Sequence, residues 1–139
     1  VVEMTRKNRD RSNLAAALTN VAAYALTLND VHRAQLAAHE ALSLVRDIGK
    51  TLNAMCALQH LGSVSARRGE YVRAARLEGA ANRLYGEFGL SREFTEQSLY
   101  DRTLDEIRAG IGEDELRRRL EEGAALPLEH ALDEALSVA

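Results

Sequence analysis

The sequence predicts an all-α fold of antiparallel helical hairpins that stack as a short solenoid, and three observations lead to this prediction. Hydrophobic residues make up 46% of the chain but aromatic residues only 4%. The apolar mass is therefore Ala, Leu and Val, and Ala and Leu are strong helix formers. The single proline is Pro127, so no proline interrupts the preceding helices. Small and apolar residues also recur at an offset of 40 residues, as Leu18 and Leu58 do.

Each of two repeat units is predicted to form two helices joined by a short turn. The first unit covers residues 13–49 with helices over 13–28 and 31–48, and the second covers 51–89 with helices over 51–68 and 70–88. Apolar residues from Leu14 to Leu28 are spaced by three and four, as on one helix face. Asn29 and Gly69 can adopt the positive φ that ends a helix. Asp30 is expected to cap the helix that follows it.

The residues at matching positions of the two units, and the residues next to these positions, are small, apolar or turn-forming. They are Ala22, Ala34, Ala41, Leu61, Gly62, Gly69, Tyr71, Ala74 and Ala81. Small residues on facing helices let two backbones approach to the short end of the usual spacing of about 8–10 Å. We therefore expect Gly62 and Ala74 to lie at a close helix crossing, with Leu61 and Tyr71 filling the groove beside it.

Residues 91–139 are predicted to form capping helices that differ from the repeats, and residues 1–12 form a basic lead-in. The capping helices are expected over residues 92–109, 113–122 and 128–138. Ser91 is expected to cap the first of these helices, and Gly110 and Gly112 to end it. Gly123 is expected to stop the second, and Pro127 to lie in the first turn of the third. The terminal unit of a solenoid is normally atypical because it covers the exposed end of the stack. The length of 139 residues fits a single domain.

The spacing of the repeat positions resembles that of the tetratricopeptide repeat, in which a Leu-Gly pair, a turn Gly, a Tyr and two Ala recur. The residues that carry this resemblance are Leu61, Gly62, Gly69, Tyr71, Ala74 and Ala81. The first unit is more degenerate, and the offset of 40 exceeds the usual 34 or so, as in long-helix variants. The resemblance covers residues 13–89. It implies a right-handed solenoid in which the first helix of each unit lines a concave groove.

The C-terminal sequence is similar to the end of large bacterial signalling NTPases and of LuxR- or SARP-type transcriptional regulators. The similar segments are residues 74–80, 112–116, 123 and 126–135. In those proteins helical repeats follow an ATPase domain. The resemblance implies a sensor or scaffold arm that acts in signalling or transcription regulation. It implies no ATPase activity for this chain, because the nucleotide-binding part is absent from it.

Charge and composition restrict the partner and the compartment. The net charge of −3 lacks the basic excess usual in nucleic-acid binders. Residues 101–139 hold eleven acids and five arginines; this acidic end is either ordinary solvated surface or a segment that packs against something basic. The single Cys56 excludes an intrachain disulfide. No apolar run approaches the roughly 20 residues of a membrane span, and no signal peptide is evident. We expect a cytoplasmic location, and the start at Val1 suggests a fragment of a longer protein.

No residue pattern indicates catalysis, a metal or another cofactor, so we expect a chain that is not an enzyme. The phosphate-loop pattern Gly-x-x-x-x-Gly-Lys-[Ser/Thr] is absent. Cys56 and His60 are four residues apart, which suits a zinc pair or a nucleophile with its base, but no further ligand or oxyanion hole accompanies them. The runs 113–115 and 117–119 are interpreted as the charged first turn and the solvated face of one helix.

The expected binding surface is the concave face of the repeats. The resemblance places it on Thr19, Asn20, Ala23, Thr27, Gln59, His60, Ser63 and Arg67. This polar mixture suits a protein or peptide partner, or another domain of the parent chain. A clamp for a peptide carboxylate is not supported, because Thr19 and Gln59 stand where clamping repeats have Lys. A groove filled by the chain's own last helix is an equally good interpretation.

Two further expectations concern association. Leu14, Leu18 and Val21 are predicted to form an exposed apolar face on the first helix, because no preceding repeat covers it. Weak, two-fold self-association or a segment folded over that face would bury it. The alternative function is that of a nucleic-acid-binding helical domain, because Arg6, Lys7, Arg9 and Arg11 form a small basic patch.

Overall fold

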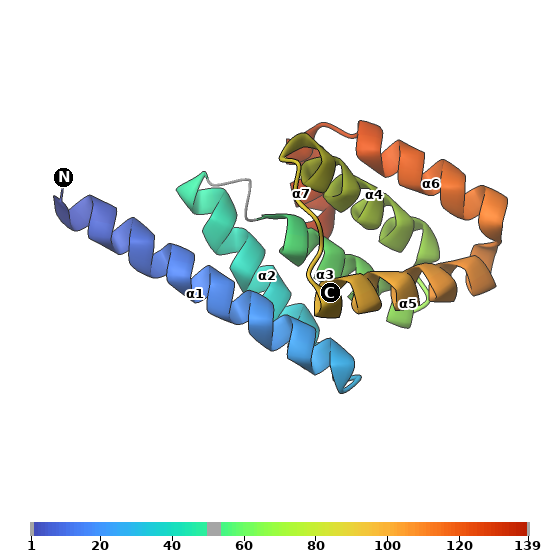
Figure 1. Cartoon of the computed structure of the whole chain (residues 1–139), viewed down its shortest axis with the longest axis horizontal. Coiled ribbons are helices and arrows are strands. Elements are labelled where there is room, and N and C mark those ends of the chain that lie inside the picture. The colour runs from blue at the N-terminus through green and yellow to red at the C-terminus, as the bar shows by residue number, and fades with distance from the viewer. Residues whose placement is uncertain (1, 50–53, 139) are drawn as a thin grey trace.

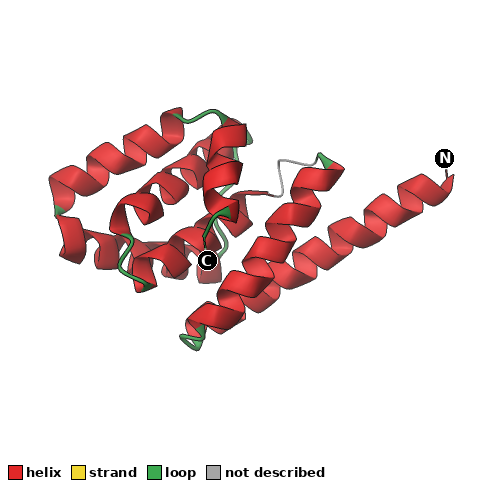
Figure 2. Cartoon of the chain, turned by 180° about the vertical axis from the view of Figure 1, so that it is seen from behind, coloured by secondary structure: helices red, strands yellow, loops and turns green. Residues whose placement is uncertain are grey.

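The computed structural model describes residues 2–49 and 54–138, and it confirms the all-α prediction. These residues form seven helices and no strand (Figures 1 and 2). The helices are α1 (Val2–Thr27), α2 (Val31–Ile48), α3 (Ala54–Arg67), α4 (Tyr71–Glu87), α5 (Phe94–Ile111), α6 (Glu113–Ala125) and α7 (Leu128–Leu136). The predicted start of the third helix, at residues 51–53, lies outside the described residues. None of the described helices has the length and hydropathy of a membrane span.

The first helix is longer than the predicted 13–28. α1 begins at Val2, so most of the basic lead-in is helical. That segment holds no Gly or Pro, and its Arg, Lys, Glu and Met residues are good helix formers, which explains why the helix continues through it. Arg11 pairs with Asp47 near the end of α2, at 3.2 Å. The N-terminal end of α1 projects beyond the rest of the molecule (Figure 1).

The helix ends in the two hairpins lie where their turn residues predict them. Asn29 has a φ of 61° and Gly69 a φ of 80°, both in the left-handed region. The Asp30 side chain accepts a hydrogen bond from the backbone N–H of Arg33 at 3.3 Å, as expected of an N-cap. Gly49, with a φ of 79°, caps the end of α2. These four residues therefore mark the end of α1, both ends of α2 and the end of α3.

The helices pack in chain order as far as α4, and then the order changes. α1 packs on α2, α2 on α3 and α3 on α4, whereas the helix that packs most extensively on α4 from the C-terminal part is α6. α5 lies across α3 and α4 and also contacts α1. α7 contacts α2, α3 and α4 (Figure 1). α5 and α7 therefore each bridge the two hairpins.

Two apolar clusters hold this arrangement together. The main cluster joins α1, α2, α3 and α4 with α7 and with Leu99 of α5, and a second joins α3 and α4 with α5 and α6. Ala22, Ala34, Ala41, Leu61 and Ala81 are fully buried in the main cluster, and Ala74 is fully buried in the second, against which Tyr71 packs. The repeat positions are therefore core positions, but they divide between two clusters.

Two glycines allow a close approach of the α4 and α6 backbones that the sequence did not predict. A Cβ at Gly79 would overlap the backbone carbonyl of Leu120, and a Cβ at Gly123 would overlap that of Arg76. The nearest atoms to a Cβ at Gly62 belong instead to the side chain of Glu78. The expectation that Gly123 ends its helix is also wrong: α6 continues to Ala125, and Gly123 is there for packing.

Two expectations about α5 are corrected. α5 begins at Phe94 after an extended Glu93, so Ser91 is exposed and is not its N-cap. Gly110 does not break the helix, since α5 continues to Ile111; it packs against the ring of Tyr71, which occupies the space a side chain would need. Gly112, with a φ of 87°, is the residue that ends α5.

Candidate binding groove

A groove lies between α1, α3 and the segment that leads into α5. Its volume is about 550 Å³. Its lining residues are Ser12, Asn13, Ala15, Ala16, Thr19, Asn20, Val45, Met55, Cys56, Tyr85, Leu90, Ser91, Glu93 and Glu96. The α1 side of the lining is small and neutral, and the α5 side carries the acidic groups. The groove thus combines apolar and neutral polar residues with acidic groups on one side.

Cys56 and Tyr85 form a neutral hydrogen-bonding pair in this lining. The Cys56 thiol lies 3.4 Å from the Tyr85 hydroxyl. Burial raises the pKa of the Cys56 thiol, and burial also raises the pKa of the Tyr85 phenol. Because the thiolate is the nucleophilic form of cysteine, Cys56 is poorly suited to nucleophilic chemistry at neutral pH.

Glu96 connects the groove to buried polar groups on α3. Its carboxyl oxygens lie 3.0 and 2.7 Å from Nε2 of His60, and Oε2 also accepts a hydrogen bond from the amide of Gln59 at 3.1 Å. Gln59 donates a second bond to the Glu96 backbone carbonyl, at 2.9 Å. His60 and Gln59 are fully buried. The position of the Glu96 carboxyl group at the groove is therefore fixed by two side chains of α3.

Arg92 completes this network from the loop before α5. Its guanidinium stacks over the rings of Tyr85 and Tyr100, 4.4 and 3.8 Å from their centroids. It donates hydrogen bonds to the side-chain oxygens of Gln59 and, at 2.6 Å, of Asn82. The half-buried cation of Arg92 is thus held in place by two aromatic rings and two amides.

Glu78 is the most isolated polar group next to this network. It is fully buried on α4, and neither of its carboxyl oxygens has a hydrogen-bond partner among the described residues. The missing side chain of Gly62 leaves the space that this carboxyl group occupies. Burial raises the pKa of Glu78 well above its usual range, although the nearby charge of Arg92 opposes the shift. Glu78 is therefore a neutral acid over part of the range in which exposed glutamates are ionised.

Half of the predicted concave face is covered by α5. Gln59, His60 and Ser63 are fully buried, and Ser63 shares a 2.7 Å hydrogen bond with Thr103 of α5. Arg67 donates to Glu106 of α5 at 2.9 Å. These residues do not form an open surface, which corrects the expectation of exposure. The covering helix is α5, not the last helix α7 of the alternative interpretation.

The α1 part of the predicted face remains partly open. Thr19 and Asn20 line the groove, whereas Ala23 is buried. Thr27 lies with Phe94 in a smaller hollow of about 300 Å³ at the other end of α1. The hydroxyl groups of Thr19 and Thr27 each donate to a carbonyl of their own helix, at 2.9 and 3.0 Å. Their oxygens can still accept a hydrogen bond from a ligand.

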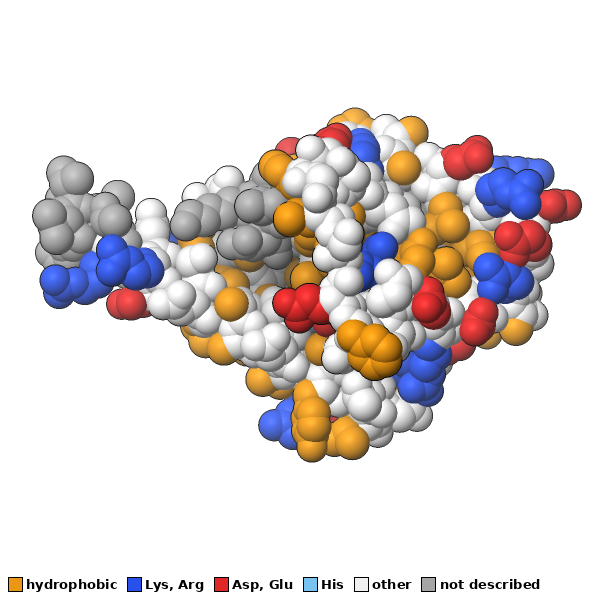
Figure 3. Space-filling view, in the orientation of Figure 1, with side chains coloured by type: hydrophobic (Ala, Val, Ile, Leu, Met, Phe, Trp, Pro, Cys, Tyr) orange, Lys and Arg blue, Asp and Glu red, His pale blue; other side chains and the backbone are white. Residues whose placement is uncertain are grey.

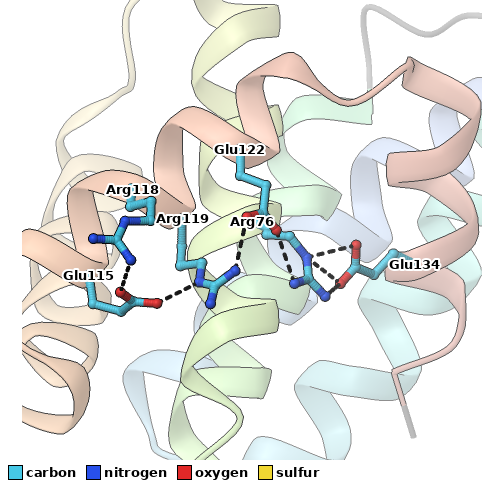
Figure 4. Close-up of polar contacts among 6 residues, drawn as sticks. All are labelled: Arg76, Glu115, Arg118, Arg119, Glu122 and Glu134. Atoms are coloured by element: carbon cyan, nitrogen blue, oxygen red, sulfur yellow. Dashed lines mark hydrogen bonds and ion pairs between the residues drawn. The ribbon is translucent and has the colours of Figure 1, made fainter.

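The acidic C-terminal region packs against arginines of the hairpins. Arg76 of α4 pairs with Glu134 of α7 at 2.5 Å and with Glu122 of α6 at 3.2 Å (Figure 4). Arg46 of α2 pairs with both Glu129 and Asp133 of α7, each at 2.7 Å. Ion pairs in Figure 4 also join Arg118 and Arg119 to Glu115, and Arg119 to Glu122. Of the two interpretations of the acidic C-terminal end, solvated surface or packing against basic residues, the second therefore applies, and the basic residues belong to the chain itself.

The other sequence candidates for chemistry do not converge. His60 hydrogen-bonds to Glu96 and Cys56 to Tyr85, so the two residues that sequence spacing brings together have different partners. No group of three or more His, Cys, Asp or Glu side chains that could hold a metal ion occurs within residues 2–49 and 54–138. Sequence reasoning missed Arg92 and Glu78, whose buried surroundings depend on helices that are distant in sequence.

The fold and groove define the chain as an all-α protein with a mixed polar and apolar groove between two hairpins and a covering helix. Comparison with family models, with curated proteins and with solved structures finds no match.

Proposed function

We propose that the chain is a non-catalytic protein-binding module, a helical-repeat arm of a bacterial regulatory protein, and that the groove is its binding site. The groove of about 550 Å³ carries this proposal. Its size falls within the range of about 300–1,000 Å³ that ligand pockets have. Its walls come from α1, α3 and the segment that leads into α5, which pack on one another in the fold, so the groove is largely formed before a partner binds. The partner is a segment of another protein or of another domain of the parent chain.

The proposal treats the two hairpins as a short right-handed solenoid of the tetratricopeptide type, in a cytoplasmic protein. The chain-order packing of α1 to α4 and the buried Ala and Gly at repeat positions support this interpretation. In such a stack the groove beside α1 and α3 is the concave side. α5 fills the part of that side beyond Glu96 and leaves the part before it open.

The lining suggests which side chains the groove receives. Its ionisable carboxylic acids are Glu93 and Glu96, and no Lys or Arg belongs to the described residues that line it. Ala16, Val45 and Met55 offer apolar contact beside them. A lysine or arginine side chain combines an apolar stem with a cationic head, so it can contact both. We therefore infer that the bound segment presents a lysine or arginine.

The neutral state of the pair formed by Cys56 and Tyr85 supports a binding role over a catalytic one. A raised pKa keeps each group protonated at neutral pH, so little thiolate or phenolate is present to act as a nucleophile or base. Both can still donate or accept a hydrogen bond to a peptide. The groove thus offers recognition groups, and its one thiol is protonated.

Selection from a displayed random-peptide library, followed by calorimetric titration of synthetic hits, tests this proposal. Hits should be enriched in Lys or Arg. Ala16→Arg fills the groove with a bulky cation and should weaken binding of these peptides at least about tenfold. Val21→Arg is the matched control, because it makes the same kind of change at an exposed position on another face of α1. Peptides bound equally by Ala16→Arg and the parent chain would place the binding site elsewhere.

A further inference from the structure

The outer face of α1 carries an exposed stripe of apolar side chains. Leu14 is 46% exposed, Val21 38%, Tyr24 65% and Leu28 61%. Ala17 is exposed between them, and we call these five residues the α1 stripe. α1 lies at the edge of the molecule in both cartoon views, with α2 on its inner side, and hydrophobic side chains follow its exposed side (Figures 1, 2 and 3). An apolar face of this extent usually marks a contact surface.

The stripe differs from the face predicted from sequence. Leu18 was expected beside Leu14 and Val21, but it is partly buried and packs on the main cluster. The residues that remain outside continue instead to Tyr24 and Leu28, almost to the end of the helix. The stripe therefore spans about 21 Å along α1.

The spacing of the stripe fits another helix. Its members, residues 14, 17, 21, 24 and 28, alternate steps of three and four, which is the a and d pattern of a coiled-coil seam. Side chains at this spacing interlock with those of a second helix laid along the first. The occupant is thus a helix of about four turns with an apolar face of its own.

The lack of charged residues along the stripe fits a second copy of α1 as the partner helix. Residues 12–29 contain no Asp, Glu, Lys or Arg. Two copies of this face can therefore meet without contact between like charges. Asn13 and Asn20 are exposed along one border of the stripe. Because an amide both donates and accepts hydrogen bonds, these borders are complementary to themselves.

The charged residues beyond the two ends of the stripe determine the relative direction of the two helices. Arg6, Lys7 and Arg9 are exposed beyond the N-terminal end of the stripe. A parallel pair would place these cations beside their own copies. An antiparallel pair separates them and brings each basic end toward Asp30 of the other copy. We propose that α1 pairs antiparallel with α1 of a second copy, about a two-fold axis near Val21, so that Leu14 of one copy lies opposite Leu28 of the other. Such an interface is isologous and closed, so association stops at the dimer.

The five residues of the α1 stripe do not line the groove, although Asn13 and Asn20 border both surfaces, so the two proposals can fail independently. Sedimentation equilibrium from about 1 µM to about 1 mM should show a reversible monomer–dimer equilibrium. Val21→Arg places two cations at the axis and should weaken dimerisation at least about tenfold. Ala16→Arg, the groove variant, faces away from the stripe and should dimerise like the parent. Circular dichroism checks that both variants keep the parent's helix content.

Cross-linking tests the direction in a Cys56→Ala background. Leu14→Cys mixed with Leu28→Cys should form an intermolecular disulfide rapidly, and either variant alone should not, because only antiparallel pairing brings these positions within reach. Cross-linking of each variant with itself would show a parallel pair and overturn the proposed geometry. A chain that stays monomeric at the highest concentration, with or without Val21→Arg, would overturn the proposal and leave the stripe to a segment of another protein.

Discussion

Glu78 is a carboxylic acid in the core whose two oxygens lack a hydrogen-bond partner in the described part of the chain. Burial raises its pKa in the folded protein, whereas in the unfolded chain it titrates near the ordinary value of about 4.3. As pH rises above that value, the unfolded chain releases the proton while the folded chain keeps it. The free energy of unfolding therefore falls with rising pH, until the folded-state pKa is passed.

We expect Glu78→Gln to remove this pH dependence, because the amide has nearly the same shape and does not ionise. The variant should be more stable than the parent at about pH 8, by on the order of 1 kcal/mol or more, and the difference should shrink toward about pH 5. Urea unfolding followed by circular dichroism at several pH values measures it. Parallel pH profiles for the two proteins would mean that Glu78 is solvated or paired in solution.

Substitution of Gly123 and of Gly86 by alanine shows at which of these positions packing requires a glycine. A Cβ at Gly123 would overlap the Arg76 carbonyl, which is backbone and cannot move aside, so Gly123→Ala should cost more than about 2 kcal/mol. A Cβ at Gly86 meets nothing within 4 Å in the helix α4, so Gly86→Ala should be neutral or should stabilise by up to about 1 kcal/mol. Thermal unfolding of both variants measures the contrast. Equal melting temperatures would show that α4 and α6 pack less closely than the structure indicates.

At the scale of elements, α5 determines how much of α3 a partner can reach. Along its length it places Glu96, Thr103 and Glu106 against Gln59, His60, Ser63 and Arg67. α3 is a predominantly buried helix with a polar side, and Gln59, His60, Ser63 and Arg67 on this side hydrogen-bond to residues of α5.

Glu96→Ala should therefore loosen α5 on α3. The change leaves Nε2 of His60 and part of the Gln59 amide without their bonds in a buried site, at a cost of about 1–3 kcal/mol. Hydrogen exchange should become faster in the first turns of α5 before the rest of the chain responds. Ser98→Ala, at an exposed position of the same helix, is the control. Unchanged exchange in Glu96→Ala would show that apolar contacts alone hold α5.

At the scale of the whole molecule, the acidic C-terminal region is paired with arginines, whereas the basic N-terminal end of α1 is exposed. The acidic C-terminal region packs on Arg46 and Arg76, whereas the basic residues Arg6, Lys7 and Arg9 are exposed on the projecting end of α1. The cations that α7 covers are not free for an external polyanion. The exposed basic run on α1 is short, and the net charge of the chain is −3.

This arrangement predicts weak binding to nucleic acid. Duplex DNA should bind with a Kd no tighter than about 100 µM at about 0.15 M salt. Fluorescence anisotropy over a salt series measures both the affinity and its salt slope. Submicromolar binding with a steep salt dependence, lost on Arg6→Ala and Arg9→Ala substitution, would favour the nucleic-acid-binding alternative over the protein-binding module.

The sequence by itself determined the helices of this protein and most of their ends. The all-α class follows from Ala and Leu content and from apolar spacing, and Asn29, Asp30, Gly49 and Gly69 end or begin helices through their own backbone and side-chain preferences. These signals act within one or two helical turns, so the helix ends can be predicted from a single short stretch of sequence. The exposure of Leu14 and Val21 was predicted on a different ground, the absence of a preceding repeat that would cover the first helix.

Only the tertiary structure decided which helix covers which face. Ser63 and Thr103, which share a buried hydrogen bond, are 40 residues apart, and Gln59 and His60 are buried because α5 crosses them at that distance in sequence. The packing role of Gly123 likewise depends on the backbone of Arg76 on another helix. Helical periodicity assigns residues to a face of their own helix, but it does not specify the helix that packs there. That choice depends on how the side chains of distant segments fit together, which is a property of the folded chain as a whole.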